Sequence, residues 1–141
     1  MRILFTPAGD TDPVRGFRDG AILHILRHYP PVDKVILFLT REMEKKEKET
    51  HCYTKGIASI STDIEVNIIW SGITEPQKYE PLVKIQEAFD EAYRSHPEDT
   101  EWLLNISSGT PQIKIVMSLL ALDYERTKAI QVGTPEGGSN K

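Results

Sequence analysis

The segment WLLNISSGTPQIKIVMSLLALD, residues 102–123, decides the fold. It begins with an apolar run, Trp102–Ile106, which is typical of a buried strand. Small polar residues follow, and Thr110 then precedes Pro111 at the start of a long apolar stretch. Threonine is a favoured N-cap, and proline is tolerated in the first turn of a helix. The segment therefore predicts a strand, a tight loop and a helix, and because this helix is apolar almost all round we expect it to be well buried.

The rest of the chain repeats this alternation of strand and helix. Four further apolar runs have the length of strands: Arg2–Phe5, Val35–Leu39, Ile64–Ile68 and Lys128–Val132. Between them, apolar residues at helical spacing predict helices capped by Asp19 and Thr40, and a third around Phe89. The pattern predicts an α/β, Rossmann-like fold, a parallel five-stranded sheet with helices on both faces. The half-exposed third strand reads as an edge, which favours the strand order 3-2-1-4-5 over 2-1-3-4-5.

A run of charged residues, Arg41–Glu49, follows the second strand. Apolar residues at Tyr53, Ile57 and Ile60 continue it at helical spacing, so we expect a single helix across both segments. Charge runs of this kind are usually the solvated face of a helix. We therefore assign this run no function.

Composition limits the possible functions. The chain has 141 residues, a single cysteine and a net charge of −4, from 17 Lys and Arg against 21 Asp and Glu. This length suits one domain. A protein that holds duplex DNA by bulk charge would be basic, so we expect no duplex DNA partner. No apolar run is long enough for a spanning helix, and a lone cysteine suits a reducing compartment, so we expect a cytoplasmic protein without a membrane partner.

The expected strand order also indicates where a ligand would bind. The first and fourth strands are neighbours whose connections leave toward opposite faces, and ligands bind beyond the strand ends at such a switch point. Two loops flank it, TPAGDTDPVRGFRD at 6–19 and NISSGTPQ at 105–112. Each opens a helix, so backbone N–H groups there can bind an anion. The side chains available to assist are Arg15, Arg18, Ser107, Ser108 and Thr110.

These loops also carry a resemblance to a known family. The stretches LLNISSGTPQ (103–112), TPAGDTDPVRGFRDGAILHILRHY (6–29) and IQVGTP (130–135) resemble the CARF domain of type III-A CRISPR ribonucleases. The resemblance covers essentially the whole chain. It implies a homodimer that binds cyclic oligoadenylate across its interface as a sensor, with cyclic hexa-adenylate favoured and tetra-adenylate second.

The resemblance also implies a domain boundary. Residues 1–135 would form the CARF domain and residues 136–141 a flexible tail. In the family a HEPN ribonuclease domain follows the CARF domain, so we expect either a truncated sensor or a standalone one. Arg18 and His24 have the spacing of a HEPN motif, but they straddle the first loop and first helix of the α/β domain. We therefore expect no HEPN site among these residues.

The resemblance further implies which residues bind the ligand. They are Gly9, Asp10, Thr11, Asp12, Asn105, Ser107, Ser108, Gly109, Thr110, Gln112, Gln131 and Thr134. Arg18 joins them for its charge. Two positions depart from the family pattern, because Asp10 stands where Asn is common and Gly133 where Ser or Thr is common. An ionised Asp10 accepts hydrogen bonds but donates none, so it suits a ribose hydroxyl or an adenine amino group better than a phosphate.

Three functions remain open. The first is a sensor domain for cyclic oligoadenylate. The second is a metal-independent ring nuclease, in which a ribose 2′-OH attacks the adjacent phosphate and leaves a 2′,3′-cyclic phosphate; Thr110, Ser108 and Arg15 would then be the catalytic donors. The third is a generic nucleotide-binding α/β domain. No cofactor is expected, and no cluster of Asp, Glu, His or Cys has the spacing of a metal site.

Overall fold

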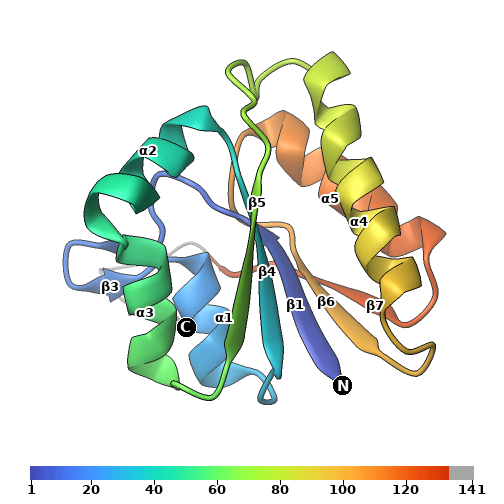
Figure 1. The fold of residues 1–141 in the computed structure, drawn as a ribbon, viewed down its shortest axis with the longest axis horizontal. Helices are drawn as coiled ribbons and strands as arrows, with labels where there is room; N and C mark the ends of the chain where they lie inside the picture. The colour runs from blue at the N-terminus through green and yellow to red at the C-terminus, as the bar shows by residue number, and fades with distance from the viewer. Residues whose placement is uncertain (134–141) are drawn as a thin grey trace.

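A parallel sheet of five strands lies between two layers of helices (Figure 1). The strands are β1 (Arg2–Pro7), β4 (Lys34–Leu39), β5 (Glu65–Trp70), β6 (Glu101–Asn105) and β7 (Thr127–Ile130). They lie in the order β5-β4-β1-β6-β7, and every neighbouring pair is parallel. Numbered along the chain this is 3-2-1-4-5, so the predicted fold and strand order are confirmed. The structure, a computed structural model, describes residues 1–133.

The helices divide between the two faces of the sheet. They are α1 (Ala21–His28), α2 (Arg41–Thr50), α3 (Cys52–Ile60), α4 (Val83–Ser95) and α5 (Pro111–Asp123). A 3-10 turn, η1 (Glu80–Leu82), leads into α4. The first three helices pack on one face and the last two on the other. None of the helices in the described part of the chain is long and apolar enough to cross a membrane.

The core follows the alternation of side chains along the buried strands. In β1, Leu4 points to the layer of α1, α2 and α3, whereas Ile3 and Phe5 point to the layer of α4 and α5. On the second face Phe89 is the centre of an aromatic cluster. Its ring centroid lies 5.1 Å from that of Phe5 and 5.2 Å from that of Trp102. Two separate cores therefore hold β1, the strand whose end carries the first loop.

The prediction of a single helix from Arg41 to Ile60 is wrong. His51 has a left-handed backbone, with φ of 54°, and separates α2 from α3. The carboxylate of Glu47 accepts hydrogen bonds from the backbone N–H of Tyr53 at 3.0 Å and of Thr54 at 3.3 Å. A side chain of α2 thus satisfies the free N–H groups that begin α3, so a second helix can begin there.

Two other helix predictions need correction. Asp19 does not cap α1, because Gly20 is the N-cap, while Asp19 accepts a hydrogen bond from Arg27 Nε at 2.7 Å. Thr40 stands at the N-cap of α2, but its side chain makes no capping hydrogen bond.

The charged run on α2 is not simply a solvated face, and in this the prediction is also wrong. Glu44 and Glu47 are buried. Glu44 Oε2 accepts a hydrogen bond from the backbone N–H of Gly72 at 2.7 Å. Buried carboxylates need such partners, because burial without them costs several kcal/mol. The run therefore ties α2 to neighbouring segments.

The helix α5 is less buried than its composition predicts. Ile113, Met117 and Leu120 pack into the core. The opposite face carries Ile115, Leu119 and Leu122, which are 48%, 53% and 81% exposed. An apolar helix can face either a core or a partner, and composition does not distinguish the two. We call Ile115, Leu119 and Leu122 the exposed face of α5.

Candidate functional site

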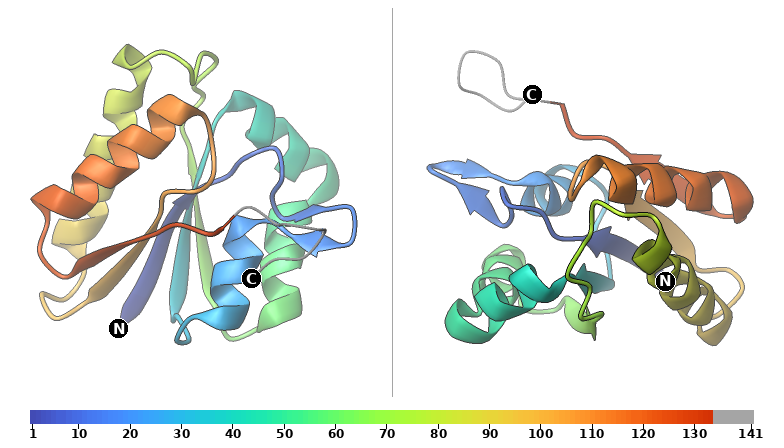
Figure 2. Two further views of the ribbon diagram at one scale, coloured as in Figure 1. Left: turned by 180° about the vertical axis from the view of Figure 1, so that it is seen from behind. Right: turned by 90° about the horizontal axis from the view of Figure 1, so that it is seen from above.

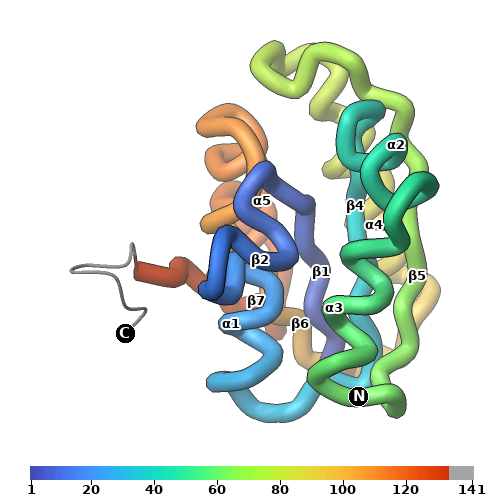
Figure 3. The backbone as a smooth tube through the Cα atoms, turned by 90° about the vertical axis from the view of Figure 1, so that its left-hand side faces the viewer, coloured from blue at the N-terminus to red at the C-terminus, as the bar shows by residue number. Residues whose placement is uncertain are grey.

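Two loops meet beyond the carboxyl ends of β1 and β6, where the strand order predicted a site. The first loop, residues 8–20, follows β1, and the second, residues 106–110, follows β6. Figure 3 shows the first loop beside the start of α5, at the end of the sheet away from the N-terminus. Their backbones are in close contact, since a Cβ atom added to Gly9 would lie 2.8 Å from the backbone nitrogen of Gly109. Glycine at position 9 therefore allows the two loops to touch.

Asp12 links the two loops to the first helix. Its carboxylate is fully buried. Oδ2 accepts hydrogen bonds from the backbone N–H of Gly9 at 2.9 Å and from the hydroxyl of Ser108 at 2.7 Å, and Oδ1 accepts one from the N–H of Ile22 at 3.2 Å. Burial raises the pKa of Asp12, while these three hydrogen bonds and the charge of Lys46 oppose the rise. Asp12 joins the first loop, the second loop and the first turn of α1.

Asn105 extends this buried network. Its Nδ2 donates to Thr6 Oγ1 at 3.0 Å and to Ser108 Oγ at 2.9 Å. Its Oδ1 accepts from the backbone N–H of Ser107 at 2.8 Å. Asn105 and Ser108 are both buried. With Asp12 they lie beneath the loops, where they hold the loop backbones in place.

Thr110 is the N-cap of α5, as the sequence predicts. Its hydroxyl oxygen accepts a hydrogen bond from the N–H of Ile113 at 3.2 Å, and its hydroxyl proton goes to the carbonyl of Pro76 at 2.7 Å. Gly109, just before it, has φ of +95°, and a Cβ there would lie 3.0 Å from Ile113. The hydroxyl group of Thr110 is therefore engaged at both its donor and its acceptor side.

A cavity of about 580 Å³ opens beside these loops. Its lining residues are Thr11, Arg15, Gly16, Arg18, Asp19, Gly20, Ala21, Ser107, Val132 and Gly133. They come from the first loop, the first turn of α1, the second loop and the segment after β7. The cavity therefore lies at the predicted switch point.

A small hairpin supplies the positive charge of this cavity. It consists of β2 (Val14–Arg15) and β3 (Arg18–Asp19), which pair in antiparallel fashion. It projects from the body of the domain (Figure 2). The turn at its tip needs Gly16, whose φ is +61°. Within residues 1–133 neither the Arg15 nor the Arg18 guanidinium has a hydrogen-bond or ion-pair partner, so both are available to a ligand.

The predicted site residues divide into three groups. Thr11, Arg15, Arg18 and Ser107 line the cavity. Gly9, Asp12, Asn105, Ser108, Gly109 and Thr110 form the framework of the two loops and do not line it. Asp10 and Gln131 are exposed on nearby segments. Thr134 and Pro135 lie outside the described residues.

Gln112 stands apart from these groups. It lies in the first turn of α5, and its Oε1 is buried without a hydrogen-bond partner. The cavity residues that the sequence analysis did not predict are Gly16, Asp19, Gly20, Ala21, Val132 and Gly133. Asp19 was interpreted only as a helix cap, whereas the others carry no polar side chain and reach the cavity because of where the backbone runs.

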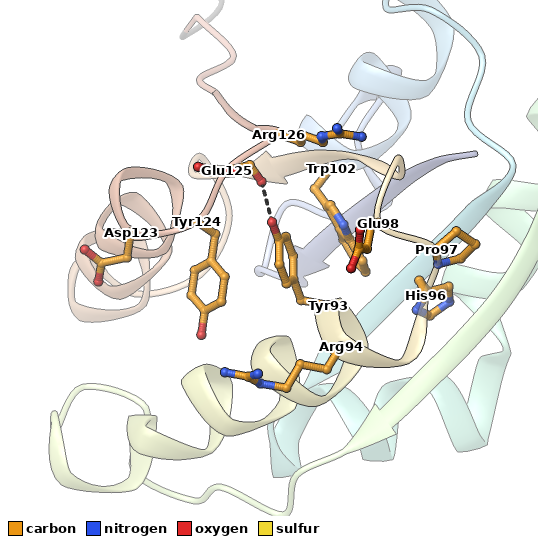
Figure 4. Close-up of a pocket in the computed structure, with 10 residues that line it drawn as sticks. All are labelled: Tyr93, Arg94, His96, Pro97, Glu98, Trp102, Asp123, Tyr124, Glu125 and Arg126. Carbon is orange, nitrogen blue, oxygen red and sulfur yellow. Dashed lines mark hydrogen bonds between the residues drawn. The ribbon is translucent and has the colours of Figure 1, made fainter.

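A larger cavity of about 750 Å³ lies at the other end of the sheet, between the end of α4 and the start of β7 (Figure 4). Several of its polar side chains have partners within the fold. The Tyr93 hydroxyl donates to the carbonyl of Glu125 at 2.9 Å. Arg94 Nε donates to Asp90 at 2.8 Å. This cavity is remote from both loops and from the helix N-termini that favour anions. The smaller cavity is therefore the candidate site.

Comparison with known proteins identifies the family to which the chain is similar. Residues 65–141 match the family model described as the Cas_Csm6 CARF domain. The CRISPR system endoribonuclease Csm6 of Enterococcus italicus is 35% identical over 99% of this chain and 34% of its own length. The corresponding protein of Mycobacterium tuberculosis is 31% identical over 99% of this chain and 34% of its own length. The chain thus spans about a third of the length of these curated relatives.

A solved structure extends the comparison to three dimensions. It is Enterococcus italicus Csm6 bound to cyclic hexa-2′-fluoro-hexa-dAMP. The alignment has a TM-score of 0.81 at 35% identity, and it covers 96% of this chain and 34% of that chain.

Proposed function

The chain belongs to the family of Csm6 CARF domains, and from this premise we propose that it binds cyclic oligoadenylate as a sensor domain. The observation that carries the proposal is the cavity at the switch point, which is lined by Arg15 and Arg18, whose guanidinium groups have no partner among residues 1–133. A phosphate of the ring would lie against these cations. Thr11 and the backbone at the start of α1 would offer further donors.

The ring is expected to extend beyond one cavity. A volume of about 580 Å³ lies within the range of pockets for single small ligands, roughly 300–1,000 Å³. A ring of four or six nucleotides exceeds it. We propose that two copies of the chain share one ring, each holding one half. A ring with an even number of nucleotides can have the same two-fold symmetry as such a dimer.

Apolar surface on this chain supports a homodimer. The exposed face of α5 has no partner within residues 1–133, and neither does Phe17, which is 108% exposed at the tip of the hairpin. Exposed apolar patches of this kind are typical of interfaces. The second copy would cover them.

Among ring sizes we propose cyclic hexa-adenylate first and tetra-adenylate second. The support is the solved relative, which is 35% identical and was captured with a cyclic hexamer analogue. In a longer protein, binding here would activate a C-terminal HEPN ribonuclease domain. That step is proposed from the relatives, which are named as endoribonucleases and are about three times as long.

One experiment separates the functions that the sequence left open. The purified protein is incubated with radiolabelled cyclic tetra-adenylate or cyclic hexa-adenylate, its affinity is measured, and the products are separated by chromatography. Tight binding with an intact ring supports a sensor. Linear adenylates ending in a 2′,3′-cyclic phosphate would add ring cleavage. If the protein bound neither ring but did bind AMP or ATP, the proposal would be overturned in favour of a generic nucleotide-binding domain.

A further inference from the structure

Lys46 on α2 makes a contact with the first loop that the proposed function does not use. Its Nζ donates a hydrogen bond to the backbone carbonyl of Asp12 at 2.9 Å, across 34 residues of chain. The ammonium also lies 5.4 Å from the centre of the Tyr53 ring, within the range of a cation–π interaction. Lys46 does not line the cavity. It therefore reaches the loop from behind.

A second contact fixes the same part of the loop. A Cβ atom added to Gly56 on α3 would lie 3.0 Å from Cβ of Pro13, so the helix and the loop pack tightly there. Tyr53, which carries the cation–π contact, is buried. The pair α2 and α3 thus supports the loop at two consecutive residues, Asp12 and Pro13.

Asp12 and Pro13 lie in the part of the first loop that shapes the candidate site. The Asp12 side chain holds Gly9, Ser108 and Ile22 by hydrogen bonds. Thr11 comes directly before it and Arg15 three residues after it, and both line the cavity. In the described part of the chain, Lys46 is the donor to the Asp12 carbonyl. Removing a donor from a buried carbonyl leaves an unsatisfied group, which favours a different loop conformation.

We propose that Lys46 is a positioning residue for ligand binding, one that sets the affinity of the site without touching the ligand. This inference rests on the proposed function for its ligand. A lysine that met a phosphate directly would also contribute to affinity, but the two roles differ in salt dependence. Loss of a phosphate contact lowers the dependence of affinity on salt, whereas loss of a contact to a carbonyl leaves it unchanged.

The test compares Lys46→Met with a matched control, Lys45→Met. Lys45 is its exposed neighbour on the same helix, so both variants remove one positive charge from α2. Affinity for cyclic hexa-adenylate is measured at several salt concentrations. We expect Lys46→Met to lose about tenfold in affinity with an unchanged salt slope. We expect Lys45→Met to stay within about twofold of the unmodified protein, and Lys46→Arg, which keeps a donor, to recover most of the affinity.

Equal affinities of Lys46→Met and Lys45→Met would overturn the inference. So would a salt slope reduced as far as in Arg18→Ala, because Lys46 would then meet a phosphate itself. Amide hydrogen exchange of the free protein provides a second, ligand-independent measurement. In Lys46→Met the amides of Gly9, Asp12 and Ile22 should exchange faster than in the unmodified protein. The amide of Ser61, at the end of α3, should exchange at an unchanged rate. If all four amides exchanged as in the unmodified protein, the inference would also be overturned. If the unmodified protein bound no ring, the proposed function would fail, and the exchange rates would still decide whether Lys46 holds the loop.

Discussion

At the scale of single residues, the buried carboxylate of Asp12 makes stability depend on pH. Burial raises its pKa above the ordinary value of 3.8, so the folded state binds the proton more tightly than the unfolded chain does. The free energy of unfolding therefore falls as the pH rises from about 3.8 through the folded pKa. Asp12→Asn removes this titration, and it costs about 1–3 kcal/mol because Nδ2 of asparagine cannot accept a hydrogen bond, so the donors on one side of the carboxylate lose their acceptor. Urea unfolding should show a smaller cost at pH 7 than near pH 4, and an equal cost at both pH values would contradict the raised pKa.

Thr110 gives a second prediction at this scale. Thr110→Ala removes the cap of α5 and the donor to Pro76, so the free energy of unfolding should fall by about 1–2 kcal/mol. Affinity for the ring should fall as well, because the second loop loses its anchor. Thr110→Ser keeps the hydroxyl and should match the unmodified protein in both thermal melting and binding. A large loss of affinity with unchanged melting would instead assign the hydroxyl directly to the ligand.

At the scale of elements, the exposed face of α5 predicts a specific effect on assembly. Leu119→Asp places a charge in the middle of this face. The free energy of unfolding should change by less than about 0.5 kcal/mol because the residue is exposed, but the proposed homodimer should dissociate. Val83→Asp, at a residue of similar exposure on α4, is the control and should remain dimeric. Sedimentation velocity with cyclic hexa-adenylate present distinguishes the two, and a dimer that survives Leu119→Asp would place the interface elsewhere.

The elements also show how far sequence reasoning reaches. The parallel sheet followed from the alternation of strands and helices, and the strand order followed from the half-exposed third strand. The candidate site was placed where the first and fourth strands end, at the switch point. The break at His51 could not be predicted, because it depends on Glu47 accepting from the backbone of the next helix. The internal role of Asp12 depends on Ser108, 96 residues away, which local patterns do not contain. The exposed face of α5 was missed because an apolar surface looks the same whether it meets a core or a partner.

At the scale of the whole molecule, attraction of an anionic ring is expected to be local. The net charge is −4, so the protein as a whole repels polyanions, and the cations of the hairpin must overcome this. Affinity should therefore fall as salt rises, and the double variant Arg15→Ala/Arg18→Ala should reduce both the affinity and the dependence of affinity on salt.

EDTA should leave binding unchanged, since the described residues contain no group of three His, Cys, Asp or Glu side chains placed for a metal. Binding lost in EDTA would contradict this prediction.

The hydrogen bond from Ser108 to Asp12 has a consequence for biosynthesis. It joins residues 96 positions apart, and the bond from Asn105 to Thr6 spans 99. Contacts this distant in sequence form slowly, and on a ribosome they cannot form until the later partner has left the exit tunnel. The first loop is made early but lacks its contact with Ser108 until the second loop is made. A growing chain that ends before Asn105 therefore lacks the second loop, and the candidate site can form only after Asn105 and Ser108 have left the exit tunnel.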